Sequence, residues 1–244
     1  EHDTPSLQDN VARSVEFFNR AMRAPIADLT KGKVVPPLFT ANVDDLWSGN
    51  RGQDSKKWPR PQALVKPDFS NADISNAAWT WQDNLLVAKN AGDLWTQDSY
   101  GDFVLTLEFR CTEKAEGDIL LRGNPANPAL GPIAVHILQG DDPDQKHVVG
   151  AILDVAAPTR QISINPGEWY RYVITAKGNL LSVMLNGEEV VKANLDDWKE
   201  AHKNPDGTQN SSDRPYKDLP REGQIGFRSK GAQIELRHVL IEKM

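Results

Sequence analysis

Residues 100–123, YGDFVLTLEFRCTEKAEGDILLRG, hold two strand patterns joined by a short charged turn. Apolar side chains alternate with the others through residues 103–110, and a similar alternation returns through residues 118–122. Because successive side chains along a β-strand point to opposite faces, the first segment has one wholly apolar face. The stretch therefore predicts two β-strands, and the short turn favours pairing between them.

A polar sheet face follows if these two strands pair. It would carry Glu108, Arg110 and Arg122, and the predicted strand at residues 133–138 would add His136 at mid-strand. Cβ atoms directly opposite each other on neighbouring strands are about 4.5–5.5 Å apart, which is close enough for contact. Such a cluster is typical of an enzyme or a sugar-binding sheet. The alternative is a solvated face whose ion pairs contribute little, with a buried histidine bonded to a carbonyl.

Three more residues are candidates for the same site. Asp154, in GAILDV, could add a second carboxylate from the segment that follows. Trp47 and Trp58 lie in or beside a polar, proline-bearing loop at residues 48–75. Because an indole face stacks well on a sugar ring, we expect both tryptophans at a pocket rim.

Short apolar runs punctuated by proline and glycine continue from residue 38 to the C-terminus. They predict about eleven strands, at residues 79–87, 103–110, 118–122, 133–138, 151–155, 161–164, 170–176, 180–185, 189–193, 224–227 and 233–241. Lys177-Gly178-Asn179 and Asn186-Gly187 are typical hairpin turns. The pattern predicts an all-β domain at residues 38–244, a sandwich or jelly roll of two antiparallel sheets. A second long loop is expected at residues 199–222.

Residues 1–37 are predicted to form a helical extension before this domain. Val11, Val15, Phe18 and Met22 recur at three- and four-residue steps within residues 10–24, and Pro25 follows. This period is that of an amphipathic helix. We expect the helix to pack on the domain, and the alternative is that it binds a partner.

Composition excludes several classes of protein. The chain has 28 basic and 34 acidic residues in 244, with no long basic run, which argues against nucleic acid as a partner. No apolar stretch approaches the roughly 20 residues of a membrane span. Cys111 is the single cysteine, so no disulfide can form within the chain. Since the chain opens at Glu1, we expect an exported, periplasmic or extracellular protein whose signal has been removed.

An acidic turn is the one candidate for a metal ion. Asp141, Asp142 and Asp144 lie close together, and oxygen ligands at this density could hold calcium. Their spacing matches no EF-hand loop, so a solvated turn is the favoured interpretation. Motifs of zinc sites, phosphate loops and serine hydrolases are missing from the sequence.

Taken in order, the pieces of residues 38–244 resemble the 3-keto-disaccharide hydrolase family, a concanavalin A-like jelly roll. The matching pieces are LWT at 94–96, YGDF at 100–103, LEFR at 107–110, ILLRG at 119–123, GAILD at 150–154, AP at 157–158, PGEW at 166–169, AKGN at 176–179, LNG at 185–187 and GQIGF at 223–227. A strand like the family's last, residues 234–241, closes the chain. No single piece is specific, but their order and spacing are.

The resemblance implies chemistry beside a ketone on a carbohydrate. A carbonyl at C3 acidifies the hydrogen at C2, a base removes that proton, and the enolate expels the group at C1. Glu108 or His136 would be the base. Arg110 and Arg122 would hold the keto oxygen or neighbouring hydroxyls, and a divalent metal such as calcium could replace an arginine.

The chain departs from the family pattern at the expected site. It reads Arg228-Ser229-Lys230-Gly231 where members often have Gln-Asp-His-Gly, and it has Ala134 and His136 where many have an acid and a glutamine. Asp118 replaces a usual glycine. A rearranged site that uses His136 and Lys230, with Arg228 beside them, could serve the same reaction. The other open function is a non-catalytic carbohydrate-binding module, and the oligomeric state is left open.

Overall fold

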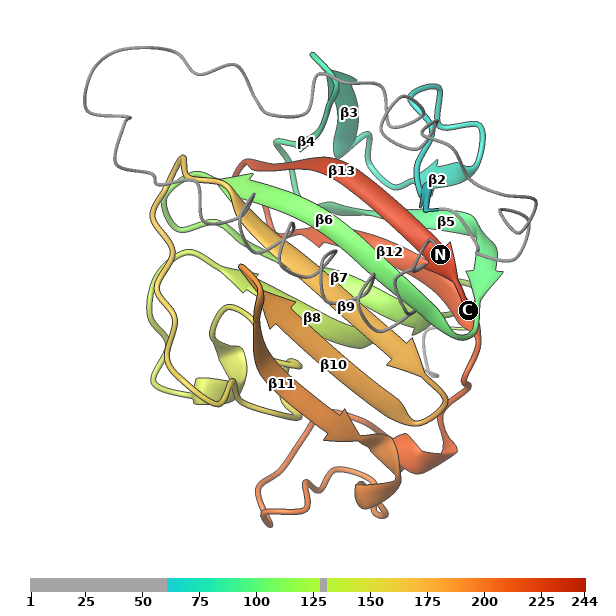
Figure 1. Ribbon diagram of the computed structural model, residues 1–244, viewed down its shortest axis with the longest axis vertical. Coiled ribbons are helices and arrows are strands. Elements are labelled where there is room, and N and C mark those ends of the chain that lie inside the picture. The colour runs from blue at the N-terminus through green and yellow to red at the C-terminus, as the bar shows by residue number, and fades with distance from the viewer. Residues whose placement is uncertain (1–60, 128–130) are drawn as a thin grey trace, which may run out of the picture. The chain divides into compact units, whose positions relative to one another are not determined.

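The computed structural model describes residues 61–127 and 131–244. They form two antiparallel β-sheets packed face to face, with the larger sheet toward the viewer in Figure 1 and β7, β8 and β12 behind it. The predicted all-β sandwich of two antiparallel sheets is therefore confirmed. The predicted helix at residues 10–24 lies outside the described residues, as do Trp47 and Trp58.

The larger sheet runs in the order β11-β10-β9-β6-β13-β4-β3, with β1 paired to β13. Its strands are β1 (Gln62–Ala63), β3 (Trp79–Gln82), β4 (Leu85–Ala88), β6 (Phe103–Cys111), β9 (Tyr170–Lys177), β10 (Leu180–Leu185), β11 (Glu188–Asn194) and β13 (Ile234–Lys243). Both predicted hairpin turns are confirmed here, because β9 pairs with β10 and β10 pairs with β11. Asn186 and Gly187 have φ values of 52° and 85°, as the tight turn between β10 and β11 requires.

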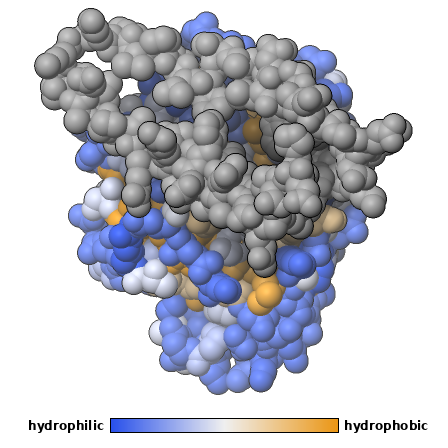
Figure 2. Space-filling model, in the orientation of Figure 1, coloured by the Kyte–Doolittle hydropathy of each residue, from blue (hydrophilic) through white to orange (hydrophobic). Residues whose placement is uncertain are grey.

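The smaller sheet runs in the order β2-β5-β12-β7-β8. Its strands are β2 (Ala72–Ile74), β5 (Gly92–Tyr100), β7 (Glu116–Gly123), β8 (Ile133–Leu138) and β12 (Gly223–Ser229). Short 3-10 helices interrupt the loops, at η4 (Gln145–His147), η5 (Leu195–Asp197) and η6 (Tyr216–Asp218). The long segment after β11, at the bottom of Figure 2, presents mainly hydrophilic residues, as a surface loop should.

The predicted pairing of residues 103–110 with residues 118–122 is wrong. β6 pairs with β9 and β13, whereas β7 pairs with β8 and β12, so the two segments lie in different sheets. Each segment has an apolar face, and the charged turn between them carries the chain across the sandwich. The two apolar faces then bury each other from opposite sides, which a single sheet could not achieve.

Other predictions at the level of single strands also need correction. Residues 79–87 form the hairpin of β3 and β4, which turns at Asp83-Asn84 with φ values of 52° and 62°. Residues 151–155 and 161–164 form no regular strand. The sequence analysis missed β5, whose polar residues near both ends hide its alternation.

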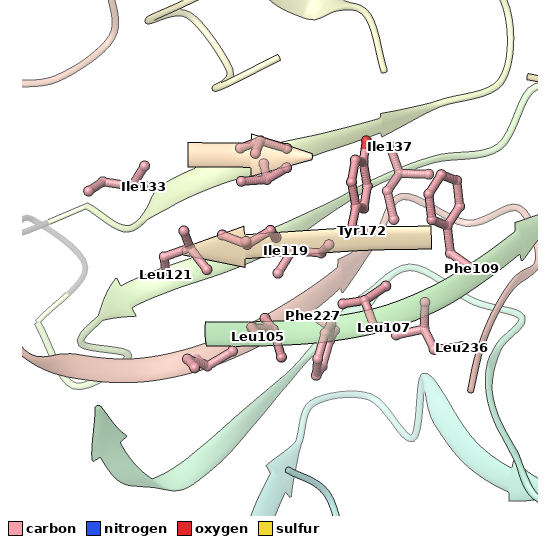
Figure 3. Close-up of a cluster of buried hydrophobic side chains, with 14 of the residues drawn as sticks. Leu105, Leu107, Phe109, Ile119, Leu121, Ile133, Ile137, Tyr172, Phe227 and Leu236 are labelled. Atoms are coloured by element: carbon pink, nitrogen blue, oxygen red, sulfur yellow. The ribbon is translucent and has the colours of Figure 1, made fainter. Parts of the chain in front are cut away.

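The core fills the space between the sheets. Figure 3 shows side chains from β6, β7, β8, β9, β12 and β13 meeting there. They include Leu105, Leu107, Phe109, Ile119, Leu121, Ile133, Ile137, Tyr172, Phe227 and Leu236, all of them buried. Burying one such side chain contributes about 1.5–3 kcal/mol, so this layer dominates the stability of the domain. It also fixes the opposite residues of each strand on the outer faces.

Arg122 is buried although it was predicted for a polar sheet face. Leu121 and Arg122 together lie opposite Ile225 of β12, so β7 has a bulge there, and Arg122 has a φ of 52°. A bulge redirects the side chain that follows it. The Arg122 guanidinium donates to the carbonyls of Gly101 and Gly178, at 2.7–3.0 Å, and therefore ties together loops from both sheets.

We predict that Arg122→Met lowers the free energy of unfolding by about 3 kcal/mol, because the carbonyls of Gly101 and Gly178 lose the charged donor that links them. The matched control is Arg160→Met, which removes an exposed ion pair with Glu188. It should cost less than about 1 kcal/mol. Urea unfolding of both variants checks this, and equal losses would contradict the structural role of Arg122.

Candidate functional site

Four charged or polar side chains form a row across the outer face of the smaller sheet. His136 of β8 lies opposite Asp118 of β7, Asp118 lies opposite Arg228 of β12, and Arg228 lies opposite Asp93 of β5. Since the alternate residues of these strands fill the core, the row has to face outward. Four strands therefore bring together residues that lie up to 135 positions apart in the sequence.

Asp118 and His136 form the central pair of this row. Their Oδ1 and Nδ1 atoms are 2.7 Å apart, and each side chain is 1% exposed. An Asp118 carboxylate at this distance accepts a hydrogen bond from Nδ1–H, so a neutral His136 ring keeps its lone pair on Nε2. Nε2 lies 3.8 Å from Oε1 of Glu116, which Lys230 binds from the other side.

Arg228 is held at the other end of the row. Its Nε and Nη2 atoms donate to the two carboxylate oxygens of Asp93, each at 2.8 Å. This hydrogen bonding raises the pKa of Arg228 above its ordinary value. The bidentate contact fixes the plane of the guanidinium, so Arg228 presents a rigid positive group beside Asp118.

A second histidine–carboxylate pair comes from the loops over this face. Nε2 of His147, in η4, lies 2.5 Å from Oδ1 of Asp154, and Oγ of Ser211 donates to Oδ2 of Asp154 at 2.5 Å. The hydrogen bond to Asp154 raises the pKa of His147. Partial burial opposes ionisation of Asp154, but hydrogen bonds from Ser211 and His147 outweigh it and lower its pKa. Asp154 is therefore a carboxylate and His147 favours the charged imidazolium.

Two adjoining pockets cover the row, and both are lined by Leu153 and Asp154. The first is about 260 Å³, and its lining residues include Glu116, His136, His147, Asp154 and Lys230. The second is about 240 Å³, and its lining residues include Asp118, Asp154, Ser211, Asp213, Tyr216 and Arg228. Together they approach the size of an ordinary small-molecule site, with Asp154 at the boundary between them.

Four of the predicted site residues meet at these pockets: His136, Asp154, Arg228 and Lys230. Arg122 does not reach them, because the bulge turns its side chain into the loops that it binds. Trp47 and Trp58 lie outside the described residues, so their expected place at the rim stays a prediction.

Glu108 and Arg110 lie on the outer face of the larger sheet, away from the row. Oε1 of Glu108 accepts from Arg171 at 2.6 Å, and Oε2 accepts from Arg237 at 2.7 Å. Partial burial opposes ionisation of Glu108, but these hydrogen bonds outweigh it and lower its pKa. A carboxylate held between two arginines is a poor base, and it lies in a different sheet from His136.

Sequence reasoning missed Asp93, His147 and Ser211, and it noted Asp118 only as a replaced glycine. Asp118 shares the outward phase of its strand with Leu120, which was a readable signal. Asp93 and the loop residues gave none, because only the fold brings them to the row.

No three His, Cys, Asp or Glu side chains in the described part of the chain lie close enough together to hold a metal ion. In the acidic turn, Asp142 and Asp144 accept hydrogen bonds from the backbone amides two residues further on. These contacts give Asp142 and Asp144 a structural role in the turn, and a bound calcium stays a prediction. No described helix is long and apolar enough to cross a membrane, and export likewise stays a prediction.

Two of the solved structures that are similar to this chain come from one bacterium. A protein of Parabacteroides distasonis ATCC 8503 named "Putative glycosyl hydrolase" is 23% identical to this chain, with a TM-score of 0.71, over 76% of this chain and 100% of that one. A second protein of that name is 17% identical, with a TM-score of 0.62, over 72% and 90% of the two chains. At these identities the likeness extends to the fold alone. No curated protein matches the chain in sequence.

The sequence itself matches one family along most of its length. The match covers residues 37–242, and the family is described as "3-keto-alpha-glucoside-1,2-lyase-like domain". This range includes every residue of the row and both histidine–carboxylate pairs. The chain therefore belongs to the 3-keto-α-glucoside-1,2-lyase-like domain family.

Proposed function

We propose that this domain cleaves a glycoside whose ring carries a ketone at C3, by removing the proton at C2 and expelling the substituent at C1. The family description names 3-keto-α-glucosides as the class of sugar and a 1,2-lyase as the class of reaction. The observation that carries the proposal is the Asp118–His136 pair, which presents the Nε2 lone pair of His136 at a pocket that also contains His147.

His136 is the base in this proposal. Asp118 fixes the ring so that Nε2 faces the pocket, and its negative charge stabilises the imidazolium that forms when the proton arrives. Because both side chains are almost fully buried, water screens that attraction weakly. A base positioned in this way typically contributes 10²–10⁴-fold to the rate.

His147 is the acid that protonates the leaving oxygen. Its hydrogen bond to Asp154 raises its pKa, so the ring stays charged at pH values above the usual range for histidine. Nε2 is occupied by Asp154, whereas Nδ1 has no hydrogen-bond partner in the part of the chain that the structure describes. The proton on Nδ1 is thus available to a substrate that spans the two pockets.

Lys230 supports the enolate. Its Nζ binds Glu116, and both residues line the pocket that contains His136. Negative charge develops on the C3 oxygen as the C2 proton leaves, and a fixed ammonium stabilises it most when water is displaced. Arg228 lines the adjoining pocket, where it can bind hydroxyls of the departing group.

The electrons move in two steps. The C2–H bond breaks, its proton passes to Nε2 of His136, and its electron pair forms the enolate between C2 and C3. The enolate then collapses to restore the C3 carbonyl, a double bond forms between C1 and C2, and the C1–O bond breaks. The leaving oxygen takes its proton from His147. Water can add to the unsaturated product afterwards, which would make the net reaction a hydrolysis.

A carbohydrate-binding module is the competing function. Among the described side chains that line the two pockets there is no tryptophan and one tyrosine, the buried Tyr216, whereas a sugar-binding site usually presents an exposed aromatic face for stacking. Binding of a 3-keto-glycoside without any product would favour this alternative over the proposed cleavage.

We predict that His136→Gln and Asp118→Asn each lower kcat for a 3-keto-glucoside by at least about 10²-fold. The first removes the base, and the second offers Nδ1 an amide that favours the wrong tautomer. Product formation over time measures both. Glu108→Gln is the control: it should lower stability while leaving kcat within about twofold. A loss of activity in Glu108→Gln equal to that in His136→Gln would contradict this assignment.

The pH dependence of the rate should report His147. Its pKa is raised, so the acid stays protonated above the ordinary histidine range, and activity is lost only as the pH rises through that higher value. We predict that His147→Gln removes this alkaline limb from the profile of kcat and lowers the maximum about 10²-fold. An unchanged alkaline limb in the variant would rule out His147 as the acid.

A further inference from the structure

A buried amide from the loop after β11 binds the backbone of Asp154. Asn204 is 2% exposed, and its Nδ2 donates to the carbonyl oxygen of Asp154 at 2.8 Å. The same nitrogen lies 3.0 Å from Oγ1 of Thr208 and 3.3 Å from the carbonyl of Gln209. Asn204 lies 50 residues beyond Asp154 in the sequence, so this contact joins two separate loops over the site.

The other end of the amide is also fixed. Oδ1 of Asn204 accepts hydrogen bonds from Nε1 of Trp198 at 2.8 Å and from Nδ2 of Asn210 at 2.9 Å. Two donors at the oxygen end and two carbonyls at the nitrogen end allow one orientation of the amide. The Asn204 side chain is therefore held in one orientation, and its hydrogen bonds restrain the groups that it contacts.

Asp154 needs such support. Its φ is 64°, which places a residue with a side chain in the left-handed region. A residue with a side chain keeps this strained conformation only where surrounding contacts impose it. It is also the conformation in which the Asp154 carboxylate reaches both His147 and Ser211.

We propose that Asn204 is a positioning residue that holds the peptide of Asp154, and so keeps the Asp154 carboxylate on Nε2 of His147. The inference rests on the proposed function, in which His147 is the acid. Asn204 contacts neither His147 nor the lining of the two pockets, and its proposed effect on His147 passes through the peptide of Asp154.

The pKa of His147 depends on whether the contact between Asn204 and Asp154 is intact. The groups whose charge acts on it are Asp154, Asp144 and Asp142, and Glu116, Lys230 and His136 share its pocket. Of these, only Asp154 forms a side-chain hydrogen bond with it among the described residues. Movement of Asp154 should therefore lower the pKa of His147, while the other charges stay in place.

The test is an NMR titration of the histidine ring protons in wild type and in Asn204→Leu, with His147→Gln used for assignment. Leucine has the branched shape of asparagine and the same number of side-chain heavy atoms, but it can neither donate nor accept a hydrogen bond. We expect the pKa of His147 to fall in the variant toward the ordinary value of about 6.5. We also expect kcat to drop about tenfold with little change in KM, and the alkaline limb to move to lower pH.

Trp198→Phe is the matched control. It removes one hydrogen bond from the oxygen end of Asn204 and leaves the contact to Asp154 intact. It should lower the melting temperature while the titration of His147 stays as in wild type. Asn204→Ser, with a side chain too short to reach Asp154, replaces the leucine variant if that variant does not fold.

The titration needs no substrate, so it tests the positioning role of Asn204 independently of the proposed function. Absence of cleavage by wild type would remove the proposed function. An unchanged pKa of His147 in a folded Asn204→Leu or Asn204→Ser protein would overturn the positioning role, and so would an equal shift in Trp198→Phe.

Discussion

The hydrogen bond between Asp118 and His136, across two neighbouring strands of the smaller sheet, is the interaction on which the candidate site depends. It exists because the inner faces of β7 and β8 carry the residues that bury the core, so Asp118 and His136 have to face outward. Burial then makes each of them dependent on the other, since a lone charged or polar group at such a position would be costly. The alternation of side chains along β7 and β8 thus determines both the packing of the core and the position of the candidate site.

The loops over the smaller sheet contribute the remaining residues of the candidate site. In the proposed mechanism the sheet supplies the base with its partner and a fixed arginine, whereas the loops supply His147, Asp154 and Ser211. Two histidines with different carboxylate partners can hold different protonation states at one pH, which an acid–base reaction requires. Asn204 lies in the loop that follows β11 and binds the backbone of Asp154. This loop contains little regular structure, and the hydrogen bond fixes it to the candidate site.

The sequence predicted the sandwich because alternation and turn residues are local properties, and residues 103–110 and the Asn186-Gly187 turn were read correctly. It could not reveal which sheet each strand joins. That choice depends on contacts between distant segments, and the error placed Glu108 beside His136. The bulge at Arg122 was equally hidden, because it arises from register with β12. The family departures at His136 and Asp118 did point to the candidate site, since they fall on outward positions of the smaller sheet, and Lys230 directly follows β12.

The central claim is that cleavage begins with loss of the proton at C2. A 3-keto-glucoside carrying deuterium at C2 tests it most directly, by mass spectrometry of the product and by comparison of rates with the unlabelled compound. The account predicts that the sugar product loses its deuterium to water and that the labelled substrate reacts more slowly. A product that keeps the deuterium, formed at an unchanged rate, would mean that the bond at C1 breaks by direct displacement and would contradict the account.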